Sequence, residues 1–203
     1  MKALLLFLLL PFTLLGQTSK DSLLQRDKDL IRDQLFFMHY LYQVKQKGYS
    51  MTYMDRLKAD RVFEKFYADT LVADNPIPSI DIQTHLKGKP KNWQELREAI
   101  NKANYLLAKN ILDTYGYVGE IRPGKEYSSF IEHFVDMPYD KRKPIGKILK
   151  KEYALGHMTD KEFELYSFFM SKESSDPKAL KKMAAKGYIR LPDSWTTSPT
   201  PRP

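Results

Sequence analysis

The sequence predicts an all-α protein, folded as a single irregular bundle of about six to seven helices. Apolar residues recur at three- and four-residue steps through most of the chain, and capping residues precede several of these runs. The one long stretch without a helical period lies at residues 74–91. The apolar fraction of 42% is sufficient to pack one core in a chain of 203 residues.

The chain opens with the features of a secretory signal peptide. Lys2 is followed by an unbroken apolar run from Ala3 to Leu10, and a second run ends in the small residue Gly16. A charged start, a short apolar run and a small residue at its end are typical of a cleavable export signal. The run is shorter than the about 20 residues that span a membrane. We therefore expect residues 1–16 to be removed, leaving a periplasmic or secreted protein without a transmembrane helix.

Two helices are predicted before the irregular stretch, at residues 22–47 and 51–72. Ser22 and Gln25 have the spacing of a capping box, which would start the first of them. Residues 74–91 are expected to form one irregular loop, because its prolines lack the backbone donor that a helix requires. Isoleucines in this loop could also form a short extended strand.

A longer helix is predicted after the loop. Asn92 has the character of an N-cap, Glu95 stands three residues further on, and Gly116 is placed to end the helix. Four shorter helices are expected to follow, at residues 127–137, 145–155, 160–171 and 177–186. We expect one exported helical domain over residues 17–192, followed by a flexible tail rich in Pro, Ser and Thr at 193–203.

The composition excludes several classes of site. The chain has no cysteine, which excludes a disulfide framework, a zinc–thiolate site, an iron–sulfur cluster and a cysteine nucleophile. No phosphate-binding glycine motif, helical zinc motif or serine-nucleophile elbow occurs. The sequence therefore predicts neither a metal site nor a bound cofactor.

His133 is the best placed of the four histidines for chemistry. Glu132 precedes it, and Asp136 lies three residues on, so that the imidazole and the Asp136 carboxylate share one helix face. A carboxylate this close could orient an imidazole as a base or as a metal ligand. These three residues are weak candidates for a catalytic site, because the second histidine of a helical zinc motif is absent.

The other histidines are weaker candidates, although His157 or Glu152 would be the nearest further ligands in sequence if His133 bound a metal. His39 lies in an apolar and aromatic run and is expected to be partly buried. His85 in the irregular loop and His157 after a helix-ending glycine are expected to be solvated.

The clearest charge feature is a basic cluster in the C-terminal half. Six cations lie within eleven residues with no acid among them: Lys141, Arg142, Lys143, Lys147, Lys150 and Lys151. Basic stripes of this kind bind nucleic acid, anionic lipid or acidic polysaccharide. Because an exported protein seldom meets nucleic acid, the expected targets are a membrane surface or an anionic polymer of the envelope.

Part of the chain resembles a family of bacterial helical domains without an established activity. The resemblance rests on Tyr115-Gly116-Tyr117-Val118-Gly119, on Phe130-Ile131-Glu132-His133, and on Leu149-Lys150-Lys151-Glu152-Tyr153. These residues resemble, in order, the family's aromatic–glycine turn, its helix with a central histidine, and a further helix. The Tyr-Gly-Thr-Gln motif that ends the family is absent here. The resemblance implies a helical domain and draws attention to His133.

Three functions are compatible with these observations. The first is an exported, non-catalytic helical protein of the bacterial cell envelope that binds an envelope or extracellular partner or has a structural role. The second is a small hydrolase or metal-dependent enzyme centred on Glu132, His133 and Asp136. The third is a protein that binds a polyanion or a membrane surface through residues 141–151. The sequence favours the first, since no catalytic motif is complete.

Overall fold

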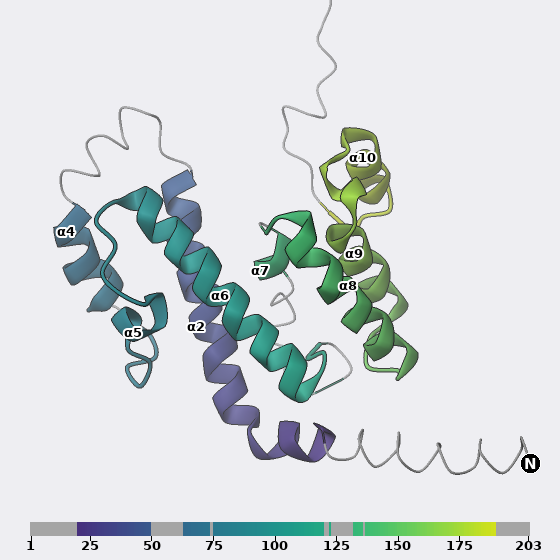
Figure 1. The fold of residues 1–203 in the computed structure, drawn as a ribbon, viewed down its shortest axis with the longest axis horizontal. Coiled ribbons are helices and arrows are strands. Elements are labelled where there is room, and N and C mark those ends of the chain that lie inside the picture. The colour runs from purple at the N-terminus through teal and green to yellow at the C-terminus, as the bar shows by residue number, and fades with distance from the viewer. Residues whose placement is uncertain are drawn as a thin grey trace, which may run out of the picture. The chain divides into compact units, whose positions relative to one another are not determined.

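The computed structural model describes residues 20–49, 63–73, 75–119, 122, 132–135 and 137–189. Helices dominate this part of the chain and no strand occurs in it, which confirms the all-α fold class (Figure 1). The chain divides into two compact units, Met1–Asp136 and Met137–Pro203. The single domain expected over 17–192 stays a prediction, and the expected signal peptide and C-terminal tail lie outside the described residues.

The first unit is built on two long helices that lie side by side, α2 (Lys28–Tyr49) and α6 (Trp93–Tyr115) (Figure 1). The helix before α2 covers residues 20–26, so the capping box predicted from Ser22 and Gln25 is wrong, because both residues already lie inside a helix. The cap of α6 is confirmed, since the Asn92 side chain accepts a hydrogen bond from the Glu95 N–H at 2.9 Å.

Aromatic side chains pack the start of α6 against the segment that precedes residues 74–91. This segment comprises α4 (Phe63–Phe66) and the π-helical turn η1 (Tyr67–Val72). The ring centroids of Phe66 and Trp93 are 4.4 Å apart, and those of Phe63 and Trp93 are 5.8 Å apart. Rings of this size dominate the burial of apolar area, and they hold the loop ends in place.

The irregular loop expected at 74–91 contains a short helix, α5 (Ile82–Leu86), so the expectation of a loop or strand is wrong for these residues. The reason is local: the Asp81 carboxylate accepts a hydrogen bond from the Thr84 N–H at 2.8 Å and starts the helix. Ile82 and Leu86, four residues apart, are both buried in the core.

The second unit contains α8 (Tyr139–Ala154), α9 (Asp160–Met170), the 3₁₀ turn η3 (Lys172–Ser175) and α10 (Pro177–Ala185). The predicted starts of α9 and α10 are confirmed. By contrast, α8 begins six residues before the predicted start at 145, with Pro144 inside it. Gly146 allows α8 and α9 to approach closely, because a Cβ at this position would lie 3.2 Å from the Met170 Cβ.

Candidate functional site

The basic cluster lies on α8, and five of its six cations are exposed. With 3.6 residues per turn, four of the exposed lysines fall within an arc of about 100° along about 12 Å of the helix axis. We call these four the lysine face: Lys143, Lys147, Lys150 and Lys151. Lys141 is exposed as well but lies about 130° from the centre of that arc.

Arg142 does not belong to an exposed stripe, which corrects the sequence prediction for this residue. Its side chain is buried and donates through Nη1 to the Phe169 carbonyl at 2.6 Å and to the Ser174 hydroxyl at 2.7 Å. It therefore satisfies a carbonyl near the end of α9, where a helix leaves its last acceptors unpaired. The role of Arg142 is structural.

The lysine face has no acidic partner within the described part of the second unit. Most carboxylates of this unit have another partner: Glu152 bonds His157, Asp160 accepts from Tyr153, Glu162 caps α9, Glu164 bonds Lys186 and Tyr188, and Asp176 caps α10. Asp140 shares the side of the lysine face, but no ion pair joins it to these lysines. Within the described part of the second unit, no ion pair therefore neutralises the four lysines.

His133 lies in the short helix α7 (Glu132–Val135) and belongs to a buried polar network of the first unit. Asn104 stands at the centre of this network and is 1% exposed. Its Nδ2 donates to the Met38 carbonyl at 3.0 Å and lies 3.4 Å from His133 Nδ1, while its Oδ1 lies 3.4 Å from His85 Nε2.

The Met38 carbonyl determines the orientation of this network. A carbonyl can only accept, so the amide nitrogen of Asn104 must face it. Nδ2 then also donates to His133 Nδ1, and Oδ1 accepts from His85 Nε2. It follows that His133 carries its proton on Nε2, and that His85 is protonated on Nε2.

Burial, with the nearby Lys45 and His39 as lesser causes, lowers the pKa of His133 to about 3. Burial also lowers the pKa of His85, opposed by its hydrogen bond to Asn104. Both imidazoles are therefore neutral at physiological pH. A general base works best with a pKa near the operating pH, and His133 does not meet this condition.

The other members of the catalytic candidate lie outside the described part of the chain. This applies to the Glu132 side chain and to all of Asp136, so whether they face His133 stays a prediction. Within the described residues, no three His, Asp or Glu side chains are placed to hold a metal ion. The structure brings His133 together with Asn104 and Tyr42 instead, the latter in an edge-to-face contact at 5.7 Å.

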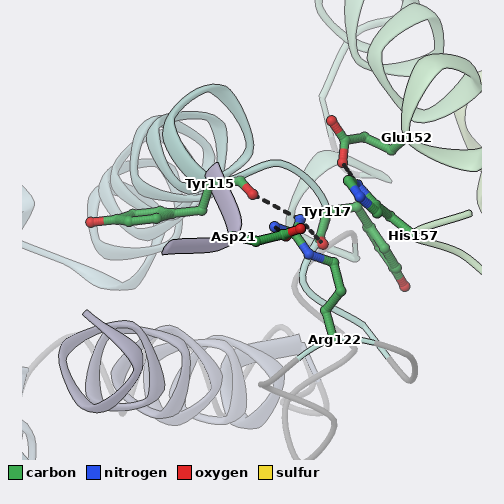
Figure 2. Close-up of polar contacts among 6 residues, drawn as sticks. All are labelled: Asp21, Tyr115, Tyr117, Arg122, Glu152 and His157. Atoms are coloured by element: carbon green, nitrogen blue, oxygen red, sulfur yellow. Dashed lines mark hydrogen bonds and ion pairs between the residues drawn. The ribbon is translucent and has the colours of Figure 1, made fainter. Parts of the chain in front are cut away.

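His157 was expected to be solvated, and it is buried instead. Its Nδ1 lies 2.7 Å from the Glu152 carboxylate, which is 3% exposed (Figure 2). The Gly156 N–H donates to the Tyr153 carbonyl, and the His157 N–H donates to the backbone carbonyl of Glu152. These two bonds form the Schellman motif that ends α8. This motif brings the last residue of the turn against the third-last helical residue, so the spacing Glu152…Gly156-His157 could have predicted the pair.

His39 and His85 also differ from expectation. His39 is exposed on α2, where its Nε2 lies 3.3 Å from Gln43 Nε2. It points away from the core because its neighbours Phe37 and Met38 occupy the buried face. His85 is half-buried, with an edge-to-face contact to Phe37 at 4.9 Å.

Arg122 forms a second polar cluster that sequence reasoning missed. Its guanidinium donates to the carbonyls of Tyr115 and Tyr117 at 2.8 and 2.9 Å, and to the Asp21 carboxylate at 2.6 Å (Figure 2). The arginine side chain is 6% exposed and that of Asp21 is 48% exposed. We call this cluster the arginine clasp, since it joins the helix at residues 20–26 to the end of α6.

Comparisons with known proteins find no similar protein. No family model, no curated protein and no solved structure matches this chain. The resemblance of residues 115–153 to a family of helical domains therefore stays a prediction. Among the described residues, no helix is both long enough and apolar enough to cross a membrane.

Proposed function

We propose that this protein is an exported, non-catalytic helical binding protein of the cell envelope, and that it holds a linear acidic polysaccharide along the lysine face of α8. The observation that carries the proposal is the set of four exposed lysines on one face of α8, none of which forms an ion pair within the described part of the second unit. Uncompensated charge of one sign attracts oppositely charged polymers over a Debye length.

The shape of the lysine face favours a polymer over a membrane surface. The apolar side of α8, including Ile145 and Leu149, is buried. The arc of the lysine face holds no aromatic or large aliphatic side chain that could enter a bilayer. Lysine ammonium groups are flexible point charges, suited to a row of carboxylates or sulfates rather than to one rigid anion.

Heparin, a linear sulfated polysaccharide, is a suitable probe of this face. Changing Lys143, Lys147, Lys150 and Lys151 together to Gln should weaken heparin binding at least about tenfold, because four screened attractions are removed. Wild-type affinity should also fall steeply between about 50 and 300 mM salt. The measurement is the heparin dissociation constant at both salt concentrations.

A control variant with the same net charge distinguishes binding by the lysine face from binding by the net charge of the protein. Lys141, Lys161, Lys178 and Lys181 are exposed lysines outside the lysine face, and changing these four to Gln removes the same charge. This control should keep heparin affinity within about threefold of wild type. An equal loss in both variants would refute the lysine face, and so would binding to anionic vesicles that exceeds binding to heparin.

Export is tested separately. The Lys2 start, the short apolar run and Gly16 support a mature N-terminus at Gln17. Mass spectrometry of protein recovered from the envelope or medium should give the mass of residues 17–203. Recovery of a chain that retains Met1 from those fractions would contradict cleavage while leaving the binding proposal intact.

A further inference from the structure

A groove of about 620 Å³ lies in the first unit, between α5 and α6. Its volume is within the range of small-molecule sites, about 300 to 1,000 Å³. It is lined along α6 from Glu95 to Leu107, which is about 18 Å of helix axis. The groove belongs to a different unit from the lysine face, so it is a separate candidate site.

Small residues on α6 make the hollow, and anchored residues on α5 keep it open. Ala99 and Ala103 lie one turn apart on the groove wall, where larger side chains would fill the space. On the opposite side, Ile82 and Leu86 fix α5 in the core, and His85 is held by Phe37 and Asn104. The groove is therefore formed before any ligand arrives, which reduces the cost of binding.

The apolar lining of the groove is aliphatic. Leu86, Ala99, Ala103, Leu106 and Leu107 supply it, and no aromatic ring other than the His85 imidazole contributes. Leu106 is 42% exposed, so its side chain adds accessible aliphatic surface to the groove. Such a surface suits a flexible alkyl chain, which can follow an open groove and cover these side chains.

The polar rim offers hydrogen-bond donors. Glu95 already accepts from the Lys91 N–H and from Asn92 Nδ2, and Glu98 accepts from Gln94. The ammonium groups of Lys87 and Lys102 make no hydrogen bond or ion pair with the described part of the chain. Lys87 and Lys102 balance Glu95 and Glu98 in formal charge. The glutamates already accept hydrogen bonds, whereas the two ammonium groups are still available to donate to a ligand.

We infer that this groove binds a single-chain aliphatic anion, with the alkyl chain on Ala99, Ala103 and Leu106 and the acidic head group at Lys87 and Lys102. A carboxylate or a phosphate head provides the same acceptor oxygens to these lysines. The chain provides most of the binding free energy, and the head group sets the orientation.

Dodecanoate, used below its micelle-forming concentration, is the probe, and calorimetric titration of the full chain is the measurement. We expect saturable one-to-one binding that is about fifteenfold tighter than that of octanoate, because each of the four further CH₂ groups buried in an open groove contributes roughly a twofold gain. Lys87→Gln with Lys102→Gln should weaken dodecanoate at least about fivefold and leave dodecanol unchanged. Dodecyl phosphate in place of dodecanoate distinguishes the two head groups.

Two further variants block the groove without relying on the charged rim. Ala99→Phe should fill the hollow and abolish binding, whereas Ala185→Phe, at an exposed alanine of α10, should leave it intact. Leu106→Asp changes an exposed residue, so it preserves the fold and should also prevent binding. Dodecanoate binding unchanged in Leu106→Asp, a dissociation constant above about 1 mM, or equal affinity for dodecanol would each overturn the inference.

Discussion

Replacing Arg122 with Ala should destabilise the first unit by about 3 kcal/mol. The guanidinium is buried, and its loss removes an ion pair to Asp21 and leaves the carbonyls of Tyr115 and Tyr117 without their donor. Breaking a largely buried charged network by truncating one partner is among the most costly single substitutions.

Urea unfolding followed by Trp93 fluorescence measures this loss, with Trp195 changed to Phe so that only the first unit is reported. Arg122→Lys should recover only about 1 kcal/mol, since one ammonium group cannot reproduce the fork that contacts three acceptors. Asp21→Asn should cost no more than about 1 kcal/mol, because that carboxylate is half-exposed. If Arg122→Ala lowers the free energy of unfolding by less than about 1 kcal/mol, water must satisfy the carbonyls that the guanidinium contacts, and the prediction is contradicted.

Lowering the pH from 7 to 5 should remove about 2 kcal/mol of the stability of the first unit through His133. Burial lowers the pKa of this imidazole to about 3 in the folded protein, whereas an unfolded histidine titrates near its ordinary pKa of 6.5. Below pH 6.5 the unfolded chain therefore binds a proton that the folded chain excludes. The contribution is complete above pH 6.5 and is lost at about 1.4 kcal/mol per pH unit as the pH falls toward 3.

The His133→Gln variant isolates this effect. The free energy of unfolding of this variant at pH 7 should be lower than that of wild type, because Asn104 loses its contact with the imidazole. Between pH 7 and 5, however, the variant should lose about 2 kcal/mol less of its free energy of unfolding than wild type does. Carboxyl groups contribute little in this window, since they titrate below it. His85, whose pKa is also lowered by burial, should give a residual slope of the same sign. An identical pH dependence in wild type and variant would contradict a buried, neutral His133.

The helix boundaries that could be predicted are those marked by local hydrogen-bond chemistry. Asn92 and Glu95 start α6, and Thr159 and Glu162 start α9, because each cap satisfies backbone donors only a few residues away. The start of α8 at Tyr139 was not predicted, and no side chain caps it at Pro138, so no local capping residue marks this boundary. In the structure Pro144 lies within the first two turns, where one missing backbone bond is tolerated.

The candidate sites could be predicted only in part, for a related reason. The basic cluster was predicted from the closeness of its six cations in sequence, but which of them share an exposed face of α8 was not, because the predicted helix began only at 145. The contact between His85 and Asn104 joins residues 19 positions apart, and the arginine clasp joins residues 101 positions apart. Such contacts depend on how helices pack, which a single sequence does not state. The groove was missed because alanine is common in helices for its high helix propensity, so Ala99 and Ala103 alone do not indicate a hollow on the surface.

The arginine clasp also orders the events of biosynthesis. Its two ends, Asp21 and Arg122, are separated by 101 residues of chain. At a synthesis rate of about 5 to 20 residues per second, the first helix waits roughly 5 to 20 seconds before its partner arginine is made. During that interval the segment around Asp21 cannot be locked onto the end of α6, so it stays available to whatever machinery handles the nascent chain. Synthesis of Arg122 therefore sets the earliest time at which the arginine clasp can form.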